Sequence, residues 1–144
     1  MEKEKIAELF MKGIDCSQVV VGAFAENLGI TQEEAYKMAA GFGGGMGIGE
    51  TCGAVVGAMI VLGLCFGHCD TEHMEQKDVM NAKRAEFLTK FQEKYSVCSC
   101  KSLLKHDIAD PEGMKKILDE GLLFDFCPEV VKDTIDILNE VCNG

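Results

Sequence analysis

The stretch TCGAVVGAMIVLGLCFGHC, residues 51–69, decides the fold that we expect for this chain. It holds nineteen residues without a formal charge, which is close to the minimum for a transmembrane helix. Its glycines (Gly53, Gly57, Gly63 and Gly67) dilute the hydrophobicity, and its flanks are acidic, without a nearby Lys or Arg to set an orientation. A helix that is apolar all round can also lie at the centre of a helical bundle. We therefore favour a buried central helix and expect no membrane insertion.

Helical periodicity extends over almost the whole chain on both sides of this stretch. Asp15 with Gln18 and Thr31 with Glu34 have the spacing of capping boxes, and Thr51 is the expected cap of the central helix. The predicted elements are a helix that ends near residue 13, helices over 16–28, 31–40, 51–66 and 71–95, a turn at 99–104, a helix from 111 and a last helix over 128–142. The sequence therefore predicts an all-α fold, a multi-helix bundle around a central apolar, glycine-rich helix.

The composition fits a single domain that spans residues 1–144. Hydrophobic residues make up 47% of the chain and charged residues 26%, which is enough apolar material for a core and argues against disorder. The 24 acidic and 14 basic residues give a net charge of −10. A field of this sign repels phosphate backbones and anionic lipid, so we expect no nucleic-acid partner.

The eight cysteines are the unusual part of the composition. Residues 1–5 are charged and no short apolar run follows them, so we expect no signal peptide and a cytoplasmic protein. In a reducing cytoplasm, clustered cysteines more often indicate metal or redox chemistry than structural disulfides. The chain has no Cys-x-x-Cys pair and no haem-attachment motif, so it does not predict a thioredoxin-like pair or a covalent haem.

Four cysteines share a position in the predicted fold: Cys16, Cys52, Cys100 and Cys127 each lie in the opening turn of a different helix. Free N–H groups and the positive end of the helix dipole favour an anion at such a position. A thiolate there is a better nucleophile and a better metal ligand. We therefore predict that the four converge on one site, with Cys52 as the most reactive thiol and a lowered pKa.

The segment before Cys52 contains six glycines within residues 41–49, which predicts a tight loop. Such a loop can bring backbone N–H groups close to the sulfur of Cys52. We therefore name Gly44, Gly45, Gly49 and Gly53 as candidate cofactor-binding positions. The loop lacks the Lys and Ser/Thr of a nucleotide-binding P-loop and follows no strand.

The remaining cysteines carry weaker signals. Cys65 and Cys142 lie late in apolar helices, where packing is the simpler interpretation. Cys65, Cys69 and His73 are spaced four residues apart and would share a helix face able to hold a metal, although a glycine between them favours a break. Cys98 lies close to Cys100 in sequence, and its role stays open.

The segment Cys52–Gly57 has the pattern Cys-Gly-Ala-x-x-Gly, and the chain resembles the redox-active protein family that is known for this motif and four cysteines, the C_GCAxxG_C_C family. Residues 15–18 resemble its first cysteine segment, and residues 41–49 resemble the glycine loop that precedes the motif. Cys100 and Cys127 resemble its third and fourth cysteines. The resemblance implies a redox function that uses these four residues. A related domain in split-Soret cytochromes is accompanied by an iron–sulfur cluster, so the resemblance also leaves a cluster open.

Three functions therefore remain. The first is thiol–disulfide or electron-transfer chemistry with an unknown redox partner, in which Cys52 attacks and Cys16 resolves. The second is a four-cysteine centre that binds an iron–sulfur cluster or zinc through Cys16, Cys52, Cys100 and Cys127. The third is a non-catalytic helical interaction module with the thiols as core filler. The small-residue face of the central helix would also suit a homodimer.

Overall fold

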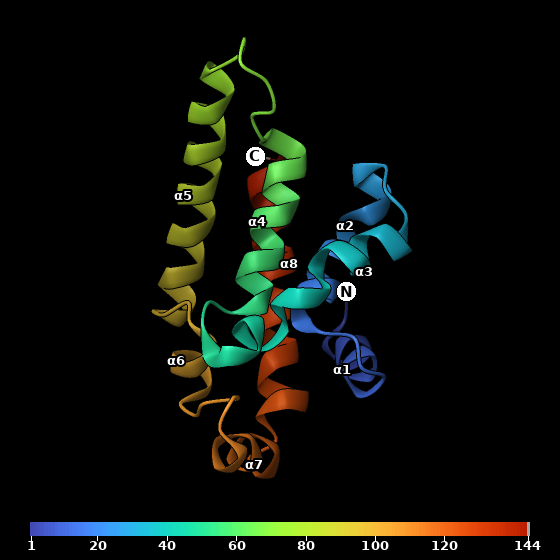
Figure 1. Ribbon diagram of the computed structural model, residues 1–144, viewed down its shortest axis with the longest axis vertical. Coiled ribbons are helices and arrows are strands. Elements are labelled where there is room, and N and C mark those ends of the chain that lie inside the picture. The colour runs from blue at the N-terminus through green and yellow to red at the C-terminus, as the bar shows by residue number, and fades with distance from the viewer. Residues whose placement is uncertain (144) are drawn as a thin grey trace.

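The structure is a computed structural model that describes residues 1–143, and it confirms the all-α fold (Figure 1). These residues form eight α-helices and no strand, with one isolated antiparallel bridge between Thr51 and Ser99. The helices are α1 (Lys3–Met11), α2 (Cys16–Leu28), α3 (Gln32–Ala39), α4 (Gly53–Phe66), α5 (Glu75–Tyr95), α6 (Cys100–Leu104), α7 (Pro111–Asp119) and α8 (Cys127–Asn143). Short helical turns lie at η1 (Ala40–Phe42), η2 (Gly45–Gly49) and η3 (Leu122–Phe126).

The helix α4 is the central helix, as predicted. It packs against α2, α5 and α8, and Figure 1 shows α5 along one side of the α4–α8 pair, with α2 and α3 on the other side. Ala54, Ala58 and Leu62 of α4 are fully buried. Gly57 permits a close approach to α2, because a Cβ there would lie 2.9 Å from the carbonyl oxygen of Ser17. No helix within residues 1–143 is both long enough and apolar enough to cross a membrane.

The two predicted capping boxes are present. The side-chain oxygen of Gln18 accepts a hydrogen bond from the Asp15 N–H at 2.8 Å. Thr31 and Glu34 cap each other reciprocally, at 3.0 and 3.1 Å. Because these bonds join residues three apart in the sequence, local spacing alone predicts them.

Two helix starts differ from the prediction. The cap of α4 is Cys52 and not Thr51, because Thr51 is held in the bridge to Ser99. The helix α5 begins four residues later than predicted. Its preceding loop is fixed by Asp70, whose carboxylate accepts hydrogen bonds from the N–H groups of Glu72 and His73 at 2.9 Å.

The glycine segment is a tight loop, as predicted, although it contains the turns η1 and η2. Its backbone takes positive φ at Gly44, Gly45, Gly47 and Gly49, where glycine avoids the strain that a side chain would cause. At Gly45 a Cβ would also lie 2.5 Å from the backbone nitrogen of Glu50. The segment therefore folds back sharply just before α4 begins.

Candidate functional site: a four-cysteine cavity

The four predicted site cysteines line one cavity of about 210 Å³. Cys16, Cys100 and Cys127 are the first residues of α2, α6 and α8, and Cys52 is the N-cap of α4. The rest of the lining is mainly apolar, from Phe10, Ile14, Ala54, Leu103, Leu104, Ile108, Met114, Leu123, Phe126, Val130 and Val131. Asp15 is the one carboxylate among the described residues that line it.

Two glycines, Gly44 in the loop before α4 and Gly53 at the start of α4, let Cys16 lie close to Cys52. Burial raises the pKa of the Cys16 thiol, and the backbone N–H of Gly44 lowers it by less, which places Gly44 beside the sulfur. A Cβ at Gly53 would overlap that sulfur and would also lie 2.9 Å from the carbonyl oxygen of Phe42. The missing side chain therefore lets the Cys16 sulfur lie directly against the first residue of α4, next to Cys52.

Cys100 is held beside Cys52 by backbone pairing. The N–H of Cys52 donates to the carbonyl oxygen of Cys98 at 2.8 Å, and the N–H of Cys100 donates to the carbonyl oxygen of Glu50 at 2.6 Å. The hydroxyl of Ser99 then caps α6 by accepting from the Ser102 N–H at 3.0 Å. Cys98 thus supplies a backbone acceptor that fixes Cys52.

Cys127 is the first residue of α8, as predicted, but its backbone N–H is not free. The turn η3 leads directly into α8, and the N–H of Cys127 already donates to the carbonyl oxygen of Leu122. Pro128 is the second residue of α8, in the first turn of the helix, where the missing N–H of proline is tolerated.

All four cavity thiols have a raised pKa, which corrects the prediction for Cys52. The N–H groups of Ala54 and Val55 do lower the pKa of Cys52, but burial and a charge on the neighbouring Cys16 raise it by more. Burial, followed by a charge on Cys16, raises the pKa of Cys100 to about 11 and that of Cys127 to about 12. The apolar lining therefore keeps the thiols protonated at neutral pH.

Two of the four candidate glycines reach the cavity. Gly44 and Gly53 line it. Gly45 shapes the turn against the Glu50 backbone, and a Cβ at Gly49 would meet the Lys101 side chain at 2.9 Å. Neither Gly45 nor Gly49 is among the described residues that line the cavity.

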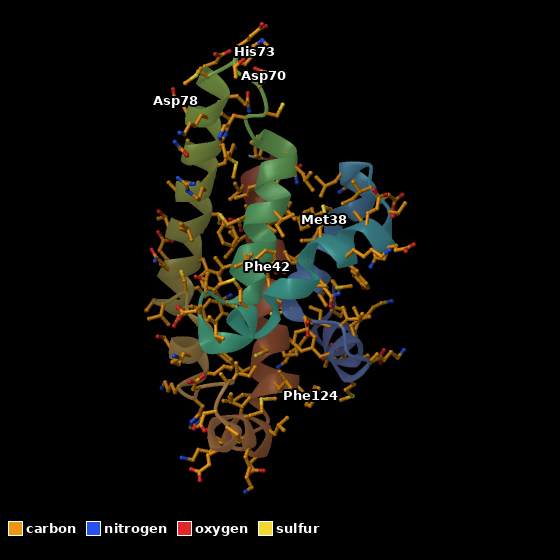
Figure 2. The ribbon with its side chains drawn as sticks, viewed as in Figure 1. Met38, Phe42, Asp70, His73, Asp78 and Phe124 are labelled. Atoms are coloured by element: carbon orange, nitrogen blue, oxygen red, sulfur yellow. The ribbon has the colours of Figure 1, made fainter. Side chains whose placement is uncertain are left out.

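The cysteines outside the cavity lie elsewhere in the molecule. All eight are free thiols, and Cys65 is exposed, so it is not the core filler that its position in an apolar helix suggested. α4 ends at Phe66, so Cys65, Cys69 and His73 do not share one helix face. Figure 2 shows Asp70 and His73 at the outer tip of the α4–α5 loop, where the His73 ring contacts the Asp70 carboxylate at 3.0 Å. Over residues 1–143, no three His, Cys, Asp or Glu side chains are grouped so that they could hold a metal ion.

Sequence reasoning missed two polar features of the site. The sequence identifies Asp15 as a helix cap, but its carboxylate also lines the cavity, and its position next to Cys16 is the signal that could have shown this. Burial raises the pKa of Asp15. The hydroxyl of Tyr95 donates to the carboxylate of buried Asp133. Burial and this hydrogen bond raise the pKa of Tyr95, and a charge on Cys52 adds a smaller contribution. No local sequence signal joins these two residues.

Comparison with known families agrees with the cysteine pattern. The family model described as "Putative redox-active protein (C_GCAxxG_C_C)" matches residues 14–141, which include all four cavity cysteines. The chain belongs to this family. No curated protein and no solved structure matches the chain. Family membership gives a redox-active class of protein, and the individual roles of the cysteines stay predictions.

Proposed function

We propose that this family member is a thiol–disulfide redox protein whose reaction centre is the pair Cys16 and Cys52, with Cys100 and Cys127 beside it. The observation that carries the proposal is the contact at Gly53. The absence of a side chain there leaves the Cys16 sulfur against the first turn of α4, adjacent to Cys52. Two thiols from different helices thus lie close together in the lining of one cavity.

The proposed reaction transfers two electrons to a redox partner that carries a disulfide. The Cys52 thiol loses its proton and its sulfur attacks one partner sulfur, which breaks the partner's S–S bond, forms a mixed disulfide and releases one partner thiol. The sulfur of Cys16 then attacks the Cys52 sulfur, forms the Cys16–Cys52 bond and releases the second partner thiol. The two protons that the cysteines lose are taken up by the two partner sulfurs.

The raised pKa values indicate the direction in which the pair works. A low thiol pKa stabilises the reduced form of a strongly oxidising protein, because the thiolate is the favoured species. Here burial disfavours the thiolate of Cys52, so this stabilisation of the reduced form is missing. We therefore assign the pair a reduction potential at the low, reducing end of the range for dithiol–disulfide proteins, so that it acts as an electron donor.

A second candidate is a metal or cluster centre formed by the same four cysteines, and one observation favours it. No Lys, Arg or His among the described residues lines the cavity, so a bound cation would supply the positive charge that thiolates need there. Thiolates are the donors that zinc and iron–sulfur clusters take, and a cluster would supply one-electron transfer. The four sulfurs would have to move closer together first, because within residues 1–143 no three of them are grouped so that they could hold a metal ion. Cys16, Cys52, Cys100 and Cys127 would be its ligands.

Anaerobic purification separates the two candidates when metal analysis and a thiol count are made on one sample. The thiol–disulfide proposal expects metal-free protein with eight titratable thiols, and mild oxidation that links the peptides of Cys16 and Cys52. Stoichiometric iron or zinc, lost in a Cys52→Ser variant and retained in a matched Cys69→Ser variant, would contradict it and support the four-cysteine centre.

A further inference from the structure

A second group of thiols lies at the opposite ends of the two central helices from the cavity. Cys65 is in the last turn of α4, and Cys142 is in the last turn of α8. Figure 1 shows α8, in red, running alongside α4 to the end of α4, far from the end where α4 begins. Cys65 is exposed to solvent, whereas Cys142 is half-buried and packs on the core.

These two thiols lie close together at the α4–α8 interface, although the residues are far apart in the sequence. Their sequence neighbours Phe66 and Val141 both contact Lys83, and Cys65 contributes to the raised pKa of Cys142. The helices that carry them pack against each other, so the pair joins two well-fixed elements. Two thiols on helices that already pack together need no rearrangement of the fold to reach the S–S bond length of about 2.05 Å.

A lysine is held beside the same two positions. The ammonium of Lys83, on α5, donates to the carbonyl oxygen of Val141 at 2.9 Å and lies 4.9 Å from the centre of the Phe66 ring. Its carboxylate neighbour, Glu86, is 3.8 Å away. Val141 and Phe66 directly adjoin Cys142 and Cys65 in the sequence. Burial and the neighbouring Cys65 raise the pKa of Cys142 to about 11, and the charge of Lys83 offsets part of that rise.

We infer that Cys65 and Cys142 are a second redox pair, separate from the cavity, that a small disulfide such as oxidised glutathione converts into an α4–α8 cross-link. The exposed Cys65 sulfur attacks one glutathione sulfur, which forms a mixed disulfide and releases one glutathione thiol. The Cys142 sulfur then attacks the Cys65 sulfur, which closes the Cys65–Cys142 bond and releases the second glutathione thiol. Two electrons pass to glutathione, and the two protons lost by the cysteines end on the two released thiols.

The test is to treat the reduced, native protein with oxidised glutathione and to map its peptides without reduction. The inference expects one peptide pair that joins Cys65 to Cys142, in a monomer that melts at a higher temperature than the reduced protein. A Cys65→Ser variant loses both the link and the melting shift. Cys69→Ser, which removes the next exposed cysteine in the adjoining loop, is the matched control and keeps both.

Several results would overturn the inference. Glutathione left on Cys65 as a stable mixed disulfide, a Cys65–Cys69 link, or a dimer joined through Cys65 would each show that Cys142 is not the partner. A Lys83→Met variant, with its fold checked by circular dichroism, should form the link several-fold more slowly, and an unchanged rate would contradict the part given to Lys83. Because the map reports the Cys16 and Cys52 peptides separately, failure here is distinct from failure of the cavity proposal.

Discussion

At the scale of single residues, we expect alanine substitutions at Gly53 and Gly63 to have opposite effects on stability, although both glycines lie in α4. A Cβ at Gly53 would overlap the Cys16 sulfur, whereas a Cβ at Gly63 meets nothing within 4 Å. We expect Gly53→Ala to lower the free energy of unfolding by about 1–3 kcal/mol through overpacking. Gly63→Ala should raise it by about 0.5–1 kcal/mol, because alanine loses less backbone entropy in a helix. Urea denaturation measures both, and a Gly53→Ala variant as stable as the parent would contradict the cavity geometry.

The raised thiol pKa values predict a loss of stability in alkali. The pKa of Cys127 rises from an ordinary value of 9.0 to about 12 on folding, and that of Cys100 rises to about 11. A group whose pKa is higher in the folded state adds stability that is complete below the unfolded pKa and is lost as the pH passes the folded pKa. For these two thiols, that stability is therefore present below about pH 9 and is lost from there towards pH 12.

Urea midpoints of reduced, metal-free protein at a series of pH values measure this effect. The contribution of the Cys100 and Cys127 thiols to the free energy of unfolding should be constant below pH 9 and decrease above it. A Cys127→Ala variant should therefore lose less stability above pH 9 than the parent protein does. Equal decreases in both proteins would mean that Cys127 titrates normally in the fold.

The limits of sequence reasoning are clear at these residues. The positions of Cys16 and Cys100 at helix starts follow from local caps, so the sequence predicts them. The direction of the pKa shift does not follow, because the apolar side chains that bury the thiols come from distant segments, such as Ile108 and Phe126. Burial by the tertiary structure outweighs the helix-end donors, which are local.

At the scale of elements, a buried carboxylate joins α5 to α8. Asp133 accepts a hydrogen bond from the Tyr95 hydroxyl and pairs with Lys94 at 3.1 Å. Tyr95→Phe leaves one oxygen of this buried group without its protein donor, so we expect a loss of about 1–3 kcal/mol in the free energy of unfolding. Lys94→Met removes an exposed partner and should cost less than about 1 kcal/mol. Thermal denaturation would refute this ranking if the lysine variant were the less stable one.

Element boundaries were predictable only where their causes are local. The capping boxes at Asp15 and Thr31 depend on residues three positions apart, and both are present. The start of α4 was misplaced because Thr51 pairs with Ser99, a residue almost fifty positions away. The start of α8 was predicted to within one residue, but nothing in the sequence shows that η3 continues into it and occupies the N–H of Cys127.

At the scale of the whole molecule, burial predicts the order in which the thiols are alkylated. Cys65 and Cys69 are exposed, whereas the four cavity thiols are buried or half-buried and have raised pKa values. We expect iodoacetamide to label Cys65 and Cys69 first in reduced native protein, and the cavity thiols much more slowly. Mass spectrometry at successive times gives the order. Early labelling of Cys52 would restore the sequence-based expectation that it is the most reactive thiol.

The overall architecture was the most predictable level. Helical periodicity and one uncharged apolar stretch are sufficient to predict a bundle around α4. The cavity is less predictable, because its walls combine separate segments that only the packed fold brings together. The closeness of Cys65 and Cys142 likewise depends on how α4 and α8 align at their ends.

The central claim, that Cys16 and Cys52 form the reaction centre, is tested most directly by a redox titration. Protein equilibrated anaerobically in dithiol–disulfide buffers of known potential would be trapped in acid and mapped by its peptides. We predict a Cys16–Cys52 disulfide that forms in a two-electron step with a midpoint below about −200 mV, nearer to thioredoxin than to a strong oxidant. Cys16 and Cys52 that remain free thiols across the whole range, or that pair with other cysteines instead, would contradict the claim.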